Sequence, residues 1–264
     1  MTQPKSIDLN SDMGEVPEAI ADGTQEKIMQ ALTSVNIACG GHAGDEFSMR
    51  ETIRQALRLG LAIGAHPGYP DRKNFGRIAL HLTAHEVAAL VAEQVSALSR
   101  IAEECGARVA HVKAHGALYN QAANDRALAA AIAQGVKRWG QDVIMVGLAG
   151  SAMLDEFRNA GFHTAAEAFA DRRYESDGTL RSRQLPGSLI AEPAEAAAQA
   201  LSIAKHGTVD AGHGSKVSIE AETICIHGDA PGAVAIAAAV AAALRQSGLS
   251  LRSLADCDKG RAVP

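Results

Sequence analysis

The sequence contains no segment suited to crossing a membrane and no patch suited to binding a nucleic acid. Its longest apolar run, Ala233–Leu244, is mostly alanine and falls short of the ~20 residues that a bilayer requires. The formal net charge is -5, without the clustered Lys and Arg typical of nucleic-acid surfaces. We therefore expect the apolar run to form a buried helix, and neither a membrane nor a nucleic acid to be a partner.

Paired cysteines are also missing. The four cysteines are Cys39, Cys105, Cys225 and Cys257. They are widely spaced, form no C-x-x-C pair, and no apolar secretory segment follows Met1. This pattern predicts reduced thiols in a cytoplasmic protein.

The composition does not change at any point that would separate two domains. A chain of 264 residues buries roughly three quarters of its unfolded surface when it folds as one unit. The glycine-rich segment at residues 39–44 lacks the sequence context of a nucleotide-binding loop. We expect a single domain over residues 1–264, in which these glycines permit close approach of the backbone to a ligand.

Short β-branched runs alternate with amphipathic stretches that end in glycine. Thr83 and Glu86 have the spacing of a capping box, and Pro193 is placed to open a helix that ends before Gly207. The candidate strands are residues 6–9, 34–38, 61–65, 108–113, 143–147, 164–168 and 223–227. The longest loops are expected at 176–186 and 206–216. The alternation predicts βαβ units and a parallel sheet, either closed as an irregular barrel or open and doubly wound.

Polar side chains follow nearly every candidate strand. In chain order they are Asp8, Asn10, Asp12, Glu15, His42, His66, Lys113, His115, Asn120, Glu167, Asp171 and Asp229. The carboxyl ends of parallel strands meet on one face of such a fold, so we expect these groups to share one bowl. Alternation places Lys113 and His115 on the same face of their strand. Burying them there is costly unless they are paired or used.

Several of these groups also have structural explanations. Asp8 and Asn10 are placed to cap the loop after the first strand, and Asp12 to cap a helix. His66, which precedes a proline, fits a buried hydrogen-bonded histidine. Asp229 fits an N-cap of the final helix. The pairing of Lys113 with His115 is the hardest of these features to explain by structure alone.

The chain resembles the LamB/YcsF family, to which the A subunits of 5-oxoprolinase belong, in motifs that run in order from about residue 7 to 230. The motifs are Asp8-Leu-Asn10-x-Asp12-x-Gly14-Glu15, Asn36-x-Ala-Cys39-Gly40-x-His42-Ala-Gly44-Asp45, Gly64-Ala-His66-Pro67, Asp71-Arg72-x-Asn74-Phe75-Gly76-Arg77, Val112-Lys113-x-His115-Gly116-Ala-Leu118-Tyr119-Asn120, Phe169-Ala-Asp171-Arg172-x-Tyr174 and His227-Gly228-Asp229. Gly41, Ala114 and Ala168 depart from the residues usual in the family, and these departures affect packing rather than polar groups.

The resemblance implies an irregular (βα)7-type parallel barrel of the glycoside hydrolase/deacetylase kind. It also implies ATP-dependent opening of 5-oxo-L-proline to L-glutamate, together with two partner subunits, B and C. ATP is then a co-substrate, and the partner subunits are expected to use it to phosphorylate the lactam oxygen. No metal is predicted under this hypothesis.

The residues support a hypothesis for the chemistry. The expected catalytic residues are Asp8, His66, Lys113 and His115. Asp8, or else Asp12, serves as general base for water, the two histidines carry the proton to the ring nitrogen, and Lys113 stabilises the oxyanion. The expected substrate-binding residues are Asn10, Asp12, His42, Arg72, Arg77, Asn120 and Asp229. Among these, either arginine is placed to hold the substrate carboxylate.

Two rival hypotheses remain. The first is a metal-dependent amidase or polysaccharide deacetylase, in which Asp8, His42, His66 and His115 bind the metal. The second is a non-catalytic subunit that binds the lactam for its partners.

Overall fold

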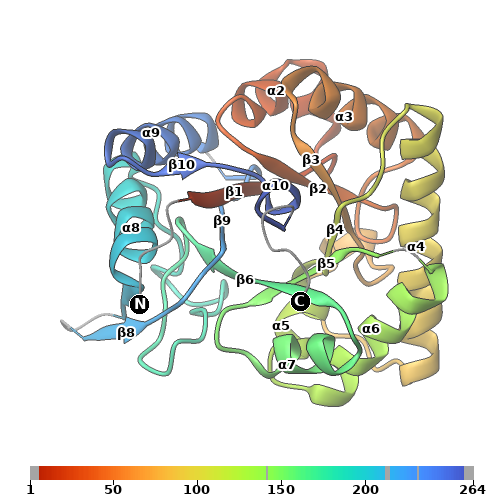
Figure 1. Ribbon diagram of the computed structural model, residues 1–264. Coiled ribbons are helices and arrows are strands. Elements are labelled where there is room, and N and C mark those ends of the chain that lie inside the picture. Colours follow the sequence, from red (N-terminus) through yellow and green to blue (C-terminus); the bar gives the residue numbers. More distant parts are fainter. Residues whose placement is uncertain (1–5, 141, 212–214, 231, 259–264) are drawn as a thin grey trace.

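Seven parallel strands form a closed barrel in the computed structural model, which describes residues 6–140, 142–211, 215–230 and 232–258 (Figure 1). The barrel strands are β1 (Ser6–Met13), β2 (Ser34–Ala38), β3 (Ala62–His66), β4 (His111–Lys113), β5 (Ile144–Leu148), β6 (His163–Phe169) and β9 (Thr223–Cys225). They pair in this order, and β9 closes the ring because it pairs with both β6 and β1. The predicted irregular parallel barrel is therefore confirmed, and the open doubly wound sheet is excluded.

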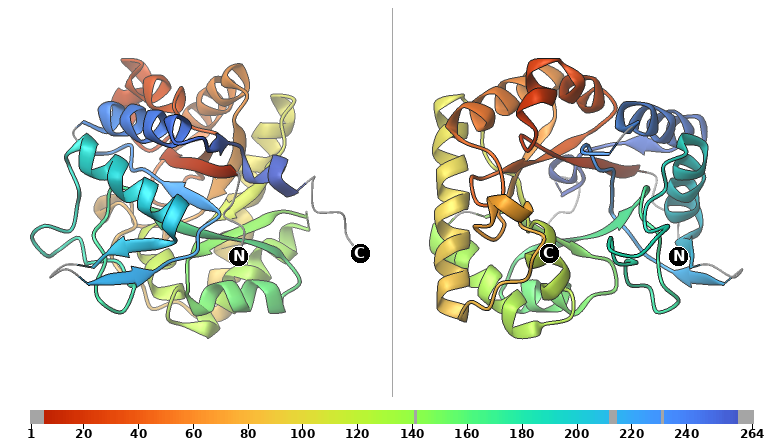
Figure 2. Two further views of the ribbon diagram at one scale, coloured as in Figure 1. Left: turned by 60° about the vertical axis from the view of Figure 1, so that its left-hand side comes forward. Right: turned by 180° about the vertical axis from the view of Figure 1, so that it is seen from behind.

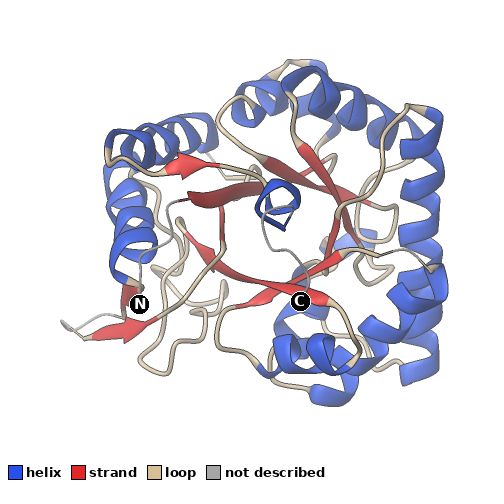
Figure 3. Ribbon diagram, viewed as in Figure 1, coloured by secondary structure: helices blue, strands red, loops and turns tan. Residues whose placement is uncertain are grey.

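Most of the helices surround the strands on the outside of the barrel, and the last one lies across one end of it (Figure 3). They are α1 (Pro17–Ala21), α2 (Thr24–Met29), α3 (Glu46–Leu59), α4 (Ala84–Glu104), α5 (Gly116–Ala122), α6 (Arg126–Trp139), α7 (Ala152–Asn159), α8 (Pro193–His206), α9 (Ala233–Gln246) and α10 (Leu254–Asp258), with a 3-10 turn, η1 (Arg72–Asn74). The capping box of Thr83 and Glu86 opens α4 as predicted. Gly207 ends α8 in the left-handed conformation that glycine tolerates.

The apolar run Ala233–Leu244 lies in α9, one face of which is buried. No helix among the described residues is both long enough and apolar enough to span a bilayer. Of the cysteines whose side chains are described, Cys39, Cys105 and Cys225 are free thiols. The side chain of Cys257 lies outside the described part of the chain.

One end of the barrel is closed by the C-terminal segment. A short strand, β10 (Ser250–Leu251), pairs with the first residues of β1. Helix α10 follows, and its Leu254 packs against Ile144, Val146 and Ala165 at the start of β5 and β6. In Figure 1 this helix is seen in front of the ring of strands. The amino-terminal end of the barrel is thus plugged, and the opposite end carries the loops that can form a site (Figure 2, right).

Three local predictions differ from the structure. The first strand was expected to end at residue 9, but β1 continues to Met13. The loop expected at 206–216 contains the antiparallel strands β7 (Thr208–Asp210) and β8 (Lys216–Ser218). Asp229 does not cap the last long helix, because Gly232 is the N-cap of α9.

Candidate active site

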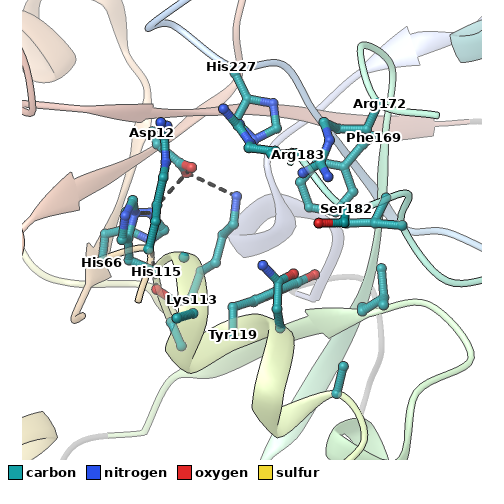
Figure 4. A pocket seen from close by; sticks show the side chains of 18 of the residues that line it. Asp12, His66, Lys113, His115, Tyr119, Phe169, Arg172, Ser182, Arg183 and His227 are labelled. Carbon is teal, nitrogen blue, oxygen red and sulfur yellow. Dashed lines mark hydrogen bonds and ion pairs between the residues drawn. The ribbon is translucent and has the colours of Figure 1, made fainter. Parts of the chain in front are cut away.

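A cavity of about 390 Å³ opens at the carboxyl ends of the barrel strands. Strand ends supply Asp12, His66, Lys113 and Phe169, and the loop after β6 supplies Arg172 and Ser182–Gln184. In Figure 4 the groups from β1, β3 and β4 lie on one side of the cavity, and the arginines of the long loop face them. Part of the expected bowl of polar groups is present, since these members line it: Asp12, Glu15, His66, Lys113, His115, Asn120 and Asp229.

Lys113 lies at the centre of the cavity wall. Its Nζ is 2.9 Å from Asp12 Oδ1 and 2.9 Å from Glu167 Oε1, and only 2% of the residue is exposed. Tyr119 donates a hydrogen bond to the other Glu167 oxygen at 2.8 Å. Burial opposes the ammonium charge, but Asp12 and Glu167 hold the pKa of Lys113 well above its usual range. The lysine is therefore a fixed positive charge at neutral pH.

Asp12 is the carboxylate that connects this lysine to the histidines. Its Oδ1 accepts hydrogen bonds from Lys113 and, at 2.8 Å, from Asn36, and its Oδ2 lies 3.2 Å from His66 Nε2. Burial alone would raise the pKa of Asp12, but His66 and Lys113 hold it well below its usual range. Asp12 therefore stays ionised at the cavity wall.

Three histidines and Glu15 form a cluster beside Asp12. His66 Nε2 and His115 Nδ1 are 3.0 Å apart, and Glu15 Oε1 lies 3.2 Å from that His115 nitrogen and 3.9 Å from that of His66. His42 Nε2 approaches the same oxygen at 2.8 Å. Glu15, His66 and His115 line the cavity, whereas His42 is behind them.

Glycines allow the loop after β3 to pack directly on this cluster. A Cβ at Gly76 would lie 2.7 Å from the Cβ of His42, and a Cβ at Gly68 would lie 2.7 Å from His42 Nδ1. Neither position has room for a side chain, so glycine is required for the close approach. The rings of His42 and His115 stack beneath this loop with their centroids 3.5 Å apart.

Arginines occupy the opposite wall. Arg172 is 5% exposed, and its Nε has no hydrogen-bond partner among the described residues. Burial, and secondarily the neighbouring Arg183, lower the pKa of Arg172 to about 10, so it remains cationic at neutral pH. Arg77 pairs with Asp229 at the rim, where Arg183 also lies 3.7 Å from that carboxylate. This wall can bind an anionic group.

Asp8 was expected to face the substrate, but it does not reach the cavity. It is 1% exposed inside the barrel, where Thr33, Ser34 and Thr223 donate hydroxyl hydrogen bonds to its carboxylate. Burial raises the pKa of Asp8 to about 6 despite these hydrogen bonds. Its proton affinity suits a general base, but the residues that line the cavity do not include it.

Asn10 is likewise below the cavity. Its amide donates to Glu167 and to Thr223 and accepts from Asn36. His111, which lies two residues before Lys113 on β4, also contacts Asn36, at 2.9 Å. These side chains form a polar layer that supports Glu167 and does not line the cavity.

The other predicted substrate-binding residues divide into two groups. Arg77, Asn120 and Asp229 line the cavity. Arg72 does not, because its guanidinium donates to the carbonyls of Gly40 and Gly44 and fixes that loop from outside. The expected metal set also changes, since Glu15 and not Asp8 lies with His42, His66 and His115.

Some residues of the site were not assigned from the sequence. Glu167 was recognised from the sequence as a polar residue at a strand end. Its place between apolar residues on β6 could have indicated that its side chain faces into the barrel. Glu15 was expected in the bowl but was given no catalytic or binding role. Arg172, Arg183 and His227 lie outside the strands, and no pattern in the sequence places a loop arginine over a cavity.

A parallel α/β barrel with ionised groups gathered at the carboxyl ends of its strands is an enzyme architecture. Residues 7–259 match the LamB/YcsF family, and the chain belongs to this family. The 5-oxoprolinase A subunit of Chloroflexus aggregans is 48% identical over 94% of this chain and 98% of its own length. That of Shouchella clausii is 47% identical with the same coverage. The crystal structure of the lactam utilization protein from Thermus thermophilus superposes with a TM-score of 0.87, at 42% identity, over 94% of this chain and all of the other.

Proposed function

We propose that this chain is the A subunit of an ATP-dependent 5-oxoprolinase, which opens 5-oxo-L-proline to L-glutamate together with B and C subunits. The observation that carries the proposal is the buried ammonium of Lys113, which lies between Asp12 and Glu167 at the wall of a cavity. The names of the relatives support the substrate class, since they are 5-oxoprolinase A subunits and a lactam utilization protein.

The division of labour follows from the chemistry of the substrate. An unstrained lactam is a poor electrophile, and transfer of a phosphoryl group from ATP to its oxygen makes the ring carbon attackable. We assign this phosphorylation to the partner subunits, in keeping with the absence of a nucleotide-loop motif from this sequence. The activated lactam then reacts with water in the cavity of this chain.

Each group at the cavity wall has a role in that step. Asp12, which is ionised and lines the cavity, orients the water and accepts its proton. Lys113 stabilises the negative charge of the phosphoryl group and of the oxygen that the attacking water brings to the ring carbon. The carbon–nitrogen bond breaks, the ring nitrogen takes up a proton to become the amine of glutamate, and a second water releases the phosphate. The arginine wall, chiefly Arg172 and Arg183, holds the anionic groups of the substrate.

The assignment of the base to Asp12 can be tested in the reconstituted three-subunit complex, with glutamate formation from 5-oxoproline and ATP as the readout. Asp12→Asn should lower kcat by at least about 100-fold, the usual contribution of general acid–base catalysis. Asp45→Asn is a matched control, because Asp45 is the exposed N-cap of α3 and asparagine caps equally well. This control should keep near-normal activity.

Thermal unfolding of both variants establishes that they fold. Near-normal turnover with folded Asp12→Asn would refute the assignment of the base. If the folded Asp12→Asn variant both kept near-normal turnover and bound 5-oxoproline with its usual affinity, the chain would be a lactam-binding subunit whose partners perform the chemistry. A wild-type complex that forms no glutamate would refute the proposed activity itself.

A further inference from the structure

The tautomers of His66 and His115 are fixed by backbone carbonyls. His66 Nδ1 lies 2.8 Å from the Lys113 carbonyl oxygen, and His115 Nε2 lies 2.8 Å from the Phe75 carbonyl oxygen. A carbonyl can only accept, so each of these nitrogens carries a hydrogen. The remaining nitrogens, His66 Nε2 and His115 Nδ1, lie 3.0 Å apart, and lone pairs on them would point toward a common position, with Asp12 Oδ2 also 3.2 Å from His66 Nε2. Such carbonyl-anchored imidazoles are the arrangement found around metal ions in proteins.

Backbone strain maintains one of these anchors. Among the described residues, Phe75 is the one residue other than glycine with a positive φ, 55°. The left-handed region is unfavourable for a bulky residue, and such strain is found where the local geometry serves a site. Here it directs the Phe75 carbonyl at His115. The ring of Phe75 meanwhile packs edge-on against His42 and His115.

The geometry points to a binding site for a divalent transition-metal ion, of the kind zinc represents, with Glu15 Oε1, His66 Nε2 and His115 Nδ1 as ligands. These atoms are 3.0, 3.2 and 3.9 Å apart. The point equidistant from these three atoms is about 2.0 Å from each of them. This distance matches the length of zinc bonds to imidazole and carboxylate. The two histidine rings are perpendicular, so both ring planes can contain that point.

His42 is a supporting residue and not a fourth ligand. Its ring is parallel to that of His115 and stacked on it, so the two lone pairs cannot meet at one ion. The contact of His42 Nε2 with Glu15 Oε1 at 2.8 Å orients the carboxylate. Three ligands with a fourth position toward the cavity are typical of catalytic zinc sites, whereas structural sites are closed by four.

The local charge favours a cation. Asp12, Glu15 and Glu167 are buried carboxylates around the cluster, and Lys113 is the ammonium that faces two of them. A divalent ion beside Glu15 would balance the remaining charge. Without an ion, His66 Nε2 faces Asp12 Oδ2 and His115 Nδ1 faces Glu15 Oε1, each at 3.2 Å. The ion would thus replace the proton-carrying role expected of these histidines from the sequence.

The site can be tested by metal binding to the full-length chain after dialysis against a chelator. Titration with Zn²⁺ by calorimetry, and with Co²⁺ by visible absorption, should give one equivalent per chain, and the Co²⁺ spectrum should be that of a four-coordinate ion. X-ray absorption of the zinc form should show two histidines among the ligands. The readout is binding alone, so failure of the proposed lactam activity would not affect it.

Variants separate this site from the other group of potential ligands, Asp12, Cys225 and His227. Glu15→Gln and His66→Ala should abolish saturable binding, and His42→Ala should weaken it by about 10–100-fold, as is usual for residues that orient a ligand. His227→Ala and His85→Ala, the latter on an exposed helix position, should bind as wild type does. Circular dichroism checks the fold of each variant.

Three results would overturn the proposal. Absence of saturable binding to the wild-type chain would show that this cluster holds no ion. Binding unaffected in folded Glu15→Gln would remove that carboxylate from the site. Loss of binding in His227→Ala, with Glu15→Gln unaffected, would move the ion to the other group.

Discussion

Replacing Asp8 by asparagine removes a carboxylate that is fully enclosed by the barrel. Burial raises its pKa from 3.8 to about 6, so the folded chain binds a proton on Asp8 more tightly than the unfolded chain does. The stability that this proton provides is complete below pH 3.8 and is lost as the pH rises through 6. The difference of pKa corresponds to about 3 kcal/mol at pH 8.

Asp8→Asn should therefore be more stable than wild type at pH 8, by up to about 3 kcal/mol. The hydroxyls of Thr33, Ser34 and Thr223 can rotate to serve the amide. At pH 5 the wild-type carboxyl is mostly protonated in the fold, and the advantage should be smaller by about 1.4 kcal/mol. Urea unfolding of the isolated chain at both pH values measures the two differences.

Asp142→Asn serves as the control, because Asp142 is exposed and its replacement should leave both free energies of unfolding unchanged. A variant at Asp8 that is less stable than wild type at pH 8, or one whose advantage does not change with pH, would contradict the reasoning. Activity provides a second measurement. Turnover of the complex with Asp8→Asn should be near normal, and its loss in a folded variant would return the base to Asp8.

Three further substitutions have defined consequences. Lys113→Met leaves Asp12 and Glu167 buried without their cation, which should cost about 3–5 kcal/mol of unfolding free energy and at least about 100-fold in kcat; wild-type turnover would exclude the oxyanion role. Tyr119→Phe removes the hydrogen bond to Glu167 and should cost about 1–3 kcal/mol in urea unfolding. Gly44→Ala places a Cβ 2.8 Å from the Ala38 carbonyl oxygen at a φ of 81°, so its melting temperature should fall, and an unchanged value would contradict the strain.

Much of the barrel was predictable from the sequence, because the spacing of apolar residues in each strand and helix matches the face that is buried in the structure. Lys113 was expected to point inward from the alternation of its strand, and it does. The end of β1 was missed because Asn10, Ser11 and Asp12 have low β-propensity. Their polar groups are stabilised in the strand by partners on other strands, such as Asn36, that no local pattern reveals.

That single difference in strand length explains why the base was assigned to Asp8. Four residues of strand span about 13 Å, so a β1 that continues to Met13 places Asp12 at the mouth and Asp8 deep in the barrel. The sequence identified the segment that carries carboxylates to the cavity, but the depth of each carboxylate depended on where the strand ends. The position of Glu15 beside His42, His66 and His115 depends on three loops that are distant in sequence, and it could not be inferred locally.

The two walls of the cavity differ in origin, and this difference bears on how the site can function. Asp12, His66 and Lys113 project from barrel strands, whose ladder hydrogen bonds fix them relative to one another. Arg172 and Arg183 come from the loop after β6, whose isolated bridges, such as Arg172 with Leu189, join parts of the loop to one another. One wall is therefore built on the barrel ladder and the other on a loop that lies outside it. Under the proposed function, this separates the groups that act on the ring from those that hold the anionic groups of the substrate.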